Sequence, residues 1–478
     1  MILNRRKFLA CSLSLSGSLL TLSPYLSACT SSSQPSSTLT FANNYVNQPN
    51  VKKRIDKALN NFSSAKVEYL SLQSDSALQT LITKFNQAIY PDVMSLDGNW
   101  PYVLAERSII APLNNSTLTS DNLQQLQNWR QDAFPKTFEA GTYNNTLYAV
   151  PFGVAPYGLW YSKKLLRAAE NDLGKPSGSF QPPKTLKELE EIMTELSQWG
   201  MQSTQGKKRV YLIGISTANT EPTFTGLWPW IWTCGGNPMR YDARGNVIDI
   251  NWTDDGTLAA FELLRKYARN NWTPLGLSAR ETRSLMAGEQ LIFKLENPSM
   301  HSYIIDVQVQ QGNHPGMTED PDNTENYQKD IDQLNQDFGV IPMPVENRLK
   351  YAPEKSVTVA DVNTLAISTR TRSTDLAWQL IYFLTHDASN IREYQSKDGI
   401  IPPRKSYDKS FYKDVISQTF INDIIESPTI SLPPYGPLYT LAGEFVISAL
   451  SDIMNHLDID IPQRLSQLNN TLQILYGL

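Results

Sequence analysis

The sequence has few cysteines, few histidines and no excess of positive charge. Three of its 478 residues are cysteine, four are histidine, and the formal net charge is −5. Cys11 lies in a predicted signal peptide and Cys29 in a predicted lipidation site, so Cys234 alone would remain, which excludes an intramolecular disulfide. Loss of the basic residues 5–7 with the signal would shift the net charge from −5 to −8. A chain this acidic offers no basic face for phosphates, which argues against nucleic acid as a partner.

The sequence also lacks an apolar run long enough to span a membrane. The one apolar segment near the N-terminus ends at Leu22 and is short and rich in serine. It follows residues 4–9, Asn-Arg-Arg-Lys-Phe-Leu, which match a twin-arginine export signal. Residues 26–29, Leu-Ser-Ala-Cys, match a lipobox, in which the thiol of Cys29 accepts a diacylglycerol. We therefore expect a signal peptide over residues 1–28, a lipidated tether over residues 29–38, and an exported protein anchored to the outer face of the cytoplasmic membrane.

Motifs for catalysis, cofactors and metals are missing. The chain contains no nucleophile elbow, P-loop or HExxH motif, and its four histidines lack metal-ligand spacing. Carboxylates in residues 312–337 suggest a calcium loop, but Pro321 interrupts them and no glycine makes the sharp turn, so we interpret the segment as a solvated excursion. We expect no enzyme, no cofactor and no metal. Glycoside hydrolysis needs a pair of carboxylates, but acidic residues are abundant in this sequence, so their presence does not distinguish an enzyme from a binding protein.

The first 120 residues alternate between strand and helix patterns. Strands are predicted over residues 39–41, 66–70 and 91–96, and amphipathic helices over residues 51–62 and 78–85. This alternation predicts an α/β fold with a mostly parallel sheet. Ligands of such sheets bind beyond the carboxyl ends of the strands. The residues that follow the first and third strands are therefore candidates for a ligand site: Asn43, Asn44, Tyr45, Asp97 and Trp100.

The middle of the chain continues the pattern with clear turn and cap signals. An Asn-Asn turn at residues 144–145 precedes two strands, over residues 147–152 and 157–161, and then a helix. Thr185 and Glu188 form a predicted capping box at the start of another helix. Further helices are predicted over residues 256–267 and 375–384, and strands over residues 290–295 and 361–368.

Motifs spread along the chain carry a family resemblance. Residues 148–165 resemble the Y-x-V-P and L-x-Y-N-K-x-L signature of the extracellular solute-binding proteins of ABC importers, family 1, the group that includes maltose-binding protein. The matching residues are Tyr148, Val150, Pro151, Leu159, Tyr161, Lys163 and Leu165, and Ser162 replaces the usual Asn. Further similar segments follow in family order at residues 234–236, 338–344, 377–384 and 399–404.

The resemblance implies a periplasmic-binding-protein-like fold, with two α/β lobes joined by hinge strands around a ligand cleft. On this analogy, the N-terminal lobe holds residues 39–154 and 361–418, and the C-terminal lobe holds residues 155–360 and 419–478. The implied function is capture of a sugar or sugar-like polyhydroxyl solute for an ABC permease, by a monomer without catalytic activity. Alternatives are a glycerophosphodiester solute, a sensor or scaffold lipoprotein without transport, and a glycoside-processing enzyme.

A tryptophan-rich segment offers the residue types that bind sugars. Sugars stack their C–H faces on aromatic rings and hydrogen-bond their hydroxyls to carboxylates and amides. Trp228, Trp230 and Trp232 alternate, so they share one face if the run is extended and spread apart if it is helical. Each is equally well explained as a core residue. The resemblance assigns a ligand-facing glutamate and an aromatic residue to this region, which correspond to Glu221 and to Trp228 or Trp230.

The remaining candidates lie near the predicted crossings between lobes or at family positions. The resemblance places a cleft-edge arginine at Arg404, which is also consistent with a surface residue. Asp361 and Asn363 lie at the crossing back between lobes and either reach the ligand or cap a turn. The other candidates are Tyr157, Glu296, Asn297 and Tyr435.

Overall fold

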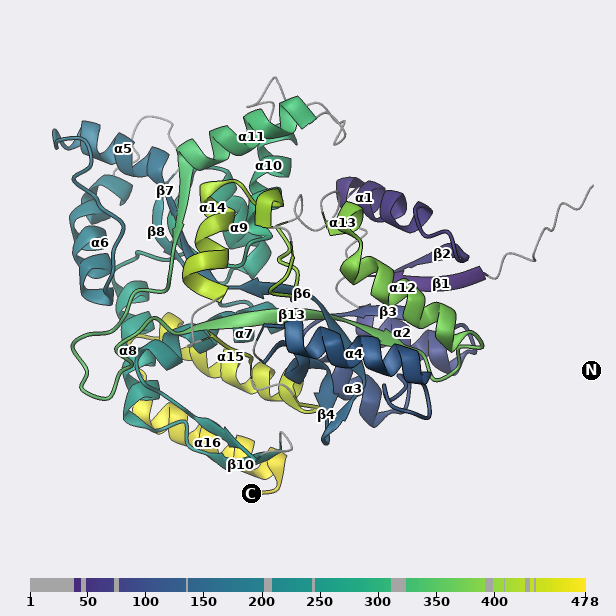
Figure 1. The fold of residues 1–478 in the computed structure, drawn as a ribbon. Helices are drawn as coiled ribbons and strands as arrows, with labels where there is room; N and C mark the ends of the chain where they lie inside the picture. Colours follow the sequence, from purple (N-terminus) through teal and green to yellow (C-terminus); the bar gives the residue numbers. More distant parts are fainter. Residues whose placement is uncertain are drawn as a thin grey trace, which may run out of the picture. The chain divides into compact units, whose positions relative to one another are not determined.

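The computed structural model describes residues 38–43, 49–72, 77–134, 136–201, 209–242, 246–310, 324–391, 399–407, 409–425, 430–433 and 436–478. The predicted export signal, Cys29, Asn44, Tyr45 and Tyr435 lie outside these residues. Within them, the larger strands form two separate sheets, and helices pack on both (Figure 1).

The first sheet has the strand order β14-β13-β3-β1-β2, and β6 pairs with β13. β1 is parallel to both β2 and β3, as the sequence predicts, but β13 runs antiparallel to β3 and to β6. The strands of the first 120 residues are therefore parallel, as predicted, and the antiparallel pairs of β13 make the complete sheet mixed. Its strands are β1 (Thr38–Asn43), β2 (Lys66–Ser71), β3 (Val93–Leu96), β6 (Ala149–Pro156), β13 (Thr358–Ile367) and β14 (Ile430–Ser431).

Apolar faces of amphipathic helices form the cores around this sheet. Phe41 of β1 and Trp378 of α12 belong to one buried cluster, and Met94 of β3 and Leu81 of α2 belong to another. The expected helices at 51–62, 78–85 and 375–384 are all present. The helices of this part are α1 (Pro49–Asn60), α2 (Ala77–Asn86), α3 (Trp100–Glu106), α4 (Ser120–Asp132), α12 (Thr374–His386) and α13 (Ala388–Asn390).

The second sheet has the order β12-β7-β11-β8, and every residue of the central strand β11 is buried. Its strands are β7 (Gly158–Ser162), β8 (Tyr211–Gly214), β11 (Leu291–Glu296) and β12 (Phe338–Ile341). The helices between them are α5 (Lys163–Asp172), α6 (Leu186–Met201), α7 (Glu221–Thr233), α8 (Asp255–Arg269), α9 (Ala279–Ala287), α10 (Met300–Gln310) and α11 (Thr324–Asp337). Two C-terminal helices, α15 (Tyr439–Asn455) and α16 (Ile461–Tyr476), share the buried cluster of α7 and α8.

Smaller elements complete the described chain. Two short hairpins pair β4 (Thr142–Tyr143) with β5 (Thr146–Leu147) and β9 (Met239–Tyr241) with β10 (Val247–Ile250). Single turns of helix occur at Thr137–Gly141 and Lys409–Phe411, and α14 (Val415–Thr419) continues into a wider π-type turn at Phe420–Ile425.

The two sheets are connected through a pair of long antiparallel strands, β6 and β13 (Figure 1). β6 leaves the first sheet and becomes β7 of the second after a single residue, Tyr157. The Tyr157 N–H donates to Val359 O (2.9 Å), and the Thr358 hydroxyl donates to Tyr157 O (2.6 Å). Two of the lobe boundaries that the family resemblance implies, 154/155 and 360/361, fall on this crossing, and the third, 418/419, lies in α14. The division into lobes stays a prediction.

Local signals in the sequence explain several element ends. Asn144 and Asn145 have φ values of 47° and 59°, the left-handed conformation that a tight hairpin turn requires. The Thr185 hydroxyl accepts from Glu188 N (3.1 Å), and the Glu188 carboxylate accepts from Thr185 N (3.2 Å), which confirms the capping box.

Two alternatives left open by the sequence are decided in part. The tryptophan-rich run is helix α7, so its three indoles do not share one face. Trp228 and Trp232, four residues apart, lie side by side with ring centroids 5.5 Å apart, whereas Trp230 meets Tyr267. Of the acidic segment 312–337, residues 324–337 form helix α11, and the rest lies outside the described residues.

Candidate functional site

Three carboxylates converge from three elements that are far apart in sequence. Asp97 follows β3, Asp361 lies on β13, and Glu221 is the first residue of α7. Both aspartates act electrostatically on Glu221, and Asn363 Nδ2 donates to Asp97 Oδ1 at 2.7 Å. We call Asp97, Glu221, Asp361 and Asn363 the carboxylate cluster. All four are sequence-predicted candidates.

The environment of Glu221 favours its protonated form. Burial, followed by repulsion from Asp361 and Asp97, raises the pKa of Glu221 from 4.5 to about 8. Hydrogen bonds from the Asn99 backbone and the Thr440 side chain oppose the shift without cancelling it. At neutral pH the cluster therefore presents carboxylate acceptors together with a carboxylic acid that donates. Such a mixture suits hydroxyl groups, which both donate and accept hydrogen bonds.

Sequence reasoning missed two members of this site, Asn99 and Thr440. Asn99 Nδ2 donates to Thr440 Oγ1 at 3.0 Å, which joins the end of β3 to the start of α15. Asn99 is fully buried, and its Oδ1 has no hydrogen-bond partner in the described part of the chain. The position of Asn99 two residues after Asp97 was a usable signal. No local pattern marks Thr440, because only the tertiary fold brings α15 to this point.

A second group of candidates lies next to the crossing strands. The Tyr157 side chain is hydrogen-bonded to Asn297, and Glu296 and Asp361 both act on it electrostatically. Glu296 is 2% exposed and forms a two-point ion pair with Arg283, with both N···O distances 2.7 Å. Burial alone would raise the pKa of Glu296, but Arg283 and Lys294 hold it at about 2. Glu296 is thus a permanently charged, buried group.

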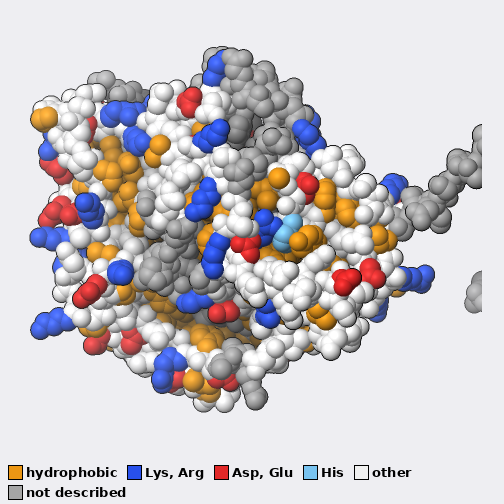
Figure 2. Space-filling view, viewed as in Figure 1, with side chains coloured by type: hydrophobic (Ala, Val, Ile, Leu, Met, Phe, Trp, Pro, Cys, Tyr) orange, Lys and Arg blue, Asp and Glu red, His pale blue; other side chains and the backbone are white. Residues whose placement is uncertain are grey.

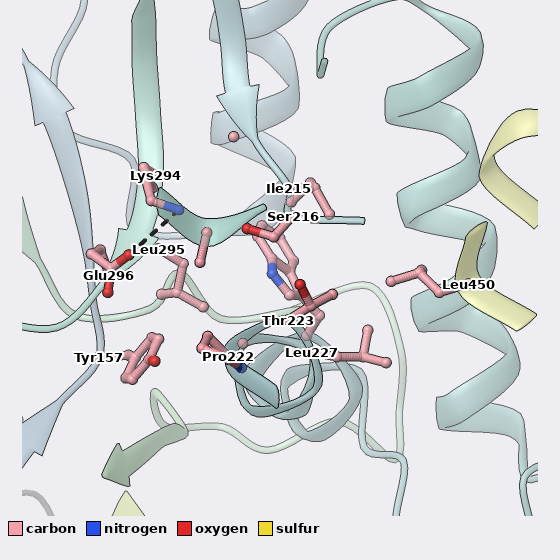
Figure 3. A pocket seen from close by; sticks show the side chains of 14 residues that line it. Tyr157, Ile215, Ser216, Pro222, Thr223, Leu227, Lys294, Leu295, Glu296 and Leu450 are labelled. Atoms are coloured by element: carbon pink, nitrogen blue, oxygen red, sulfur yellow. Dashed lines mark ion pairs between the residues drawn. The ribbon is translucent and has the colours of Figure 1, made fainter. Parts of the chain in front are cut away.

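A small cavity of about 30 Å³ lies beside this group. Figure 3 shows Lys294 and Glu296 on one side of it and Pro222, Thr223 and Leu227 of α7 on the other. Tyr157 and Trp230 also line it. The cavity is large enough for a water molecule but not for a sugar ring, so it is not by itself the solute site.

The predicted tryptophans lie in buried cores. Trp228 is 2% exposed and packs against Phe224, Trp232 and Trp252. Trp230 is also 2% exposed, and its ring meets that of Tyr267 edge to face. Trp100 is 7% exposed and belongs to the cluster beneath β1 and β3. Each ring is thus covered by protein. The contact of these rings with a ligand stays a prediction.

Two further candidates have partners of their own. Arg404 forms an ion pair with Asp132 of α4 (Nε to Oδ2, 3.6 Å) and lowers the pKa of His386 in addition to the effect of burial. Asn43 is buried at the end of β1, where its carbonyl accepts from Leu72 N (3.3 Å).

Charged side chains of both signs lie on the face in view. On the face shown in Figure 2, lysine and arginine side chains are interspersed with aspartate and glutamate. Within the described ranges, no helix has both the length and the apolar character required to cross a membrane. Those ranges also contain no group of three or more His, Cys, Asp or Glu side chains arranged to hold a metal ion.

Two α/β sheets, a pair of crossing strands and a polar cluster assembled beside the crossing define a two-lobed binding protein. The sequence profile of the bacterial extracellular solute-binding proteins matches residues 53–419, and the chain belongs to this family. Because the family is extracellular, the protein is exported. No curated protein sequence shows a significant match to the chain.

Solved structures agree with the fold. An ABC transporter solute-binding protein from Thermotoga lettingae TMO, bound with α-D-tagatose, is 19% identical, with a TM-score of 0.70 over 92% of this chain and 100% of the other. Maltose-bound MalE3 of T. maritima is 17% identical, with a TM-score of 0.68 over 92% and 99%. UgpB of Mycobacterium tuberculosis, in complex with glycerophosphocholine, is 17% identical, with a TM-score of 0.69 over 92% and 99%. At these identities the likeness establishes the periplasmic-binding-protein-like fold.

Proposed function

We propose that this protein captures a sugar or sugar-like polyhydroxyl solute and delivers it to an ABC permease. The solute class is an oligosaccharide, a disaccharide or a glycosylated polyol. The protein acts as the substrate-binding subunit of the importer, as a monomer, and without turning over its ligand. Permease subunits are its expected protein partners.

One observation carries the proposal. Asp361 and Asn363 of the crossing strand β13, Asp97 at the end of β3 and Glu221 at the start of α7 lie close enough to interact. Carboxylates and amides that converge in this way match the hydroxyl rim of a sugar, in which each hydroxyl both donates and accepts. The sugars named with two of the similar structures, tagatose and maltose, support the same class.

We further propose that Cys29 carries the lipid anchor that holds the protein at the outer face of the cytoplasmic membrane. The lipobox at residues 26–29 and the Ser/Thr/Pro-rich tether that follows support this proposal. Lipidation with two or more acyl chains anchors a protein stably, whereas one chain gives only a marginal hold.

A glycerophosphodiester is the second candidate solute. The similarity to UgpB in complex with glycerophosphocholine favours it, since the fold matches as well as those of the sugar-binding proteins. A phosphodiester is anionic, so it needs a cation in the site, whereas a neutral sugar does not.

A thermal-shift screen of the purified protein tests the proposal. Maltose, α-D-tagatose and glycerophosphocholine are the first probes. At a hundredfold excess over its dissociation constant, a ligand adds about 2.7 kcal/mol to the free energy of unfolding. A rise in melting temperature with a sugar supports the first candidate, and a rise with glycerophosphocholine alone supports the second. Sugar cleavage by the purified protein, seen by chromatography, would overturn both.

A further inference from the structure

Glu296 has no oxygen left for a solute. Its Oε1 accepts from Arg283 Nη2 (2.7 Å) and from Asn297 N (3.0 Å), and its Oε2 accepts from Arg283 Nε (2.7 Å). Lys294 Nζ lies 3.5 Å from Oε2 and donates to Thr282 Oγ1 at 2.9 Å. Glu296 and Lys294 are both 2% exposed. A buried carboxylate with this many donors is a structural anchor, because its acceptor capacity is used by the protein itself.

The anchor fixes the backbone that follows it. Asn297 N is held by Glu296, and Asn297 Oδ1 accepts from both Ser299 N (3.0 Å) and Ser299 Oγ (2.6 Å). The loop that precedes α10 is therefore held by hydrogen bonds of both the backbone N–H and the side chain of Asn297. Its side chain also hydrogen-bonds Tyr157, so the loop determines where the tyrosine ring lies.

Tyr157 connects this loop to the crossing strands and to the carboxylate cluster. Its N–H donates to Val359 O, and its C=O accepts from the Thr358 hydroxyl. Val359 and Thr358 lie two and three residues before Asp361 on β13. Asp361 faces the Tyr157 side chain closely enough to act on it electrostatically. A shift of the ring therefore alters one wall of the site where the solute is proposed to bind.

We propose that Arg283, Lys294 and Glu296, called the ion-pair trio below, are positioning residues that hold Tyr157 in the solute site through Asn297. The inference rests on the proposed function and assigns a role within the same site. Arg283 comes from α9, whereas Lys294 and Glu296 come from β11, so the trio ties a helix to the central strand. Two parallel N–H···O bonds fix the direction as well as the distance of this link.

The first test reads the position of Tyr157 without any ligand. The protein is labelled with 3-fluorotyrosine, and the fluorine resonance of Tyr157 is identified by its loss in Tyr157→Phe. In Arg283→Lys, which keeps the charge but loses the two-point geometry, and in Glu296→Gln, we expect this resonance to move. Arg265→Lys is the matched control, because Arg265 also forms a short ion pair with a glutamate, in which Nη2 donates to both oxygens of the exposed Glu262 on α8 (2.9 and 2.8 Å). An unmoved Tyr157 resonance in both trio variants would overturn the proposal.

The second test measures coupling during binding, with maltose as the probe. Arg283→Lys and Tyr157→Phe should each raise the dissociation constant for maltose. The dissociation constant of the double variant should be lower, by about threefold or more, than the value expected from multiplying the two single effects. Arg265→Lys with Tyr157→Phe should give the simple product. Multiplicative losses for the trio variant would contradict a role through Tyr157. If maltose does not bind the wild-type protein, the result counts against the proposed solute. The fluorine resonance still decides the positioning role, because it is measured without ligand.

Discussion

At the scale of single residues, burial and like charges that the fold brings together govern the protonation of Glu221. Burial is the larger cause, because removing a carboxylate from water disfavours its charged form. Repulsion adds to it: Glu221, Asp97 and Asp361 are separated by more than a hundred positions in sequence, so their mutual repulsion exists only in the folded state. The protonation of Glu221 is therefore linked to folding.

Substitution of Glu221 should change how stability depends on pH. Its pKa rises from 4.5 to about 8 on folding, so the folded protein keeps a proton that the unfolded chain releases. The stabilising contribution of this proton is fully present below pH 4.5 and is lost as the pH rises to about 8. Compared with wild type, Glu221→Gln should show a smaller fall in the free energy of unfolding across this range, measured by urea denaturation. Parallel pH profiles would contradict the raised pKa.

Replacement of Trp228 separates a core role from a ligand role. The ring is 2% exposed among three aromatic neighbours, so Trp228→Ala should destabilise the protein without ligand by about 3–5 kcal/mol. Chemical denaturation provides the measurement. If stability is unchanged while maltose binding weakens about tenfold, the sequence-based assignment of Trp228 to the ligand is the correct one.

At the scale of elements, close backbone approach connects α7 to α8. A Cβ at Gly256, in the first turn of α8, would lie 2.1 Å from Gly236 N and 2.3 Å from Gly235 C. Backbone atoms cannot move aside as a flexible side chain can. The Cys234-Gly235-Gly236 turn, noticed in the sequence as a family motif, is thus a contact that requires glycine on both sides.

Alanine at Gly256 should therefore be destabilising, by about 1–3 kcal/mol or more, because the two helices must separate. Gly226, inside α7, is the matched control, since a Cβ there meets no atom within 4 Å. Gly226→Ala should stabilise the protein by about 0.5–1 kcal/mol through helix propensity. Thermal unfolding of both variants checks this, and equal effects at the two positions would refute the packing argument.

Local sequence signals predicted most elements but only part of the site. The capping box at Thr185 and the Asn-Asn turn depend on neighbours in sequence, so they were readable. The antiparallel return of β13 and the helical state of the tryptophan run depend on tertiary packing. Carboxylates that follow strands were found as candidates, whereas Thr440 was not, because nothing near it in sequence marks its meeting with Asn99.

At the scale of the whole molecule, export and anchoring decide where binding takes place. If Cys29 is lipidated, wild-type protein should fractionate with membranes, and Cys29→Ser should be released into the soluble fraction. Because two or more acyl chains anchor a protein stably, the difference in membrane-bound fraction between wild type and Cys29→Ser should be large. Immunoblotting of the fractions measures it, and metabolic labelling with a fatty acid is the control. Wild-type protein without an acyl chain would contradict the anchor.

The crossing strands β6 and β13 link the two sheets directly. β6 and β13 pair over seven positions from Ala360 to Ala366, and the carboxylate cluster combines two residues of β13 with one that follows β3 and one that begins α7. A solute held there would contact the first sheet and helix α7 at once. The central claim is therefore that a neutral sugar binds at the carboxylate cluster.

Calorimetric titration of maltose and of α-D-tagatose into wild type and Asp361→Asn tests this claim most directly. Asp249→Asn is the matched control, because Asp249 pairs with Arg240 in the exposed β9–β10 hairpin. We expect one of the sugars to bind wild type and the control equally, and Asp361→Asn to bind about tenfold or more weakly, with its melting temperature largely retained. Binding that is unchanged in Asp361→Asn, or no binding of either sugar to wild type, would contradict the account.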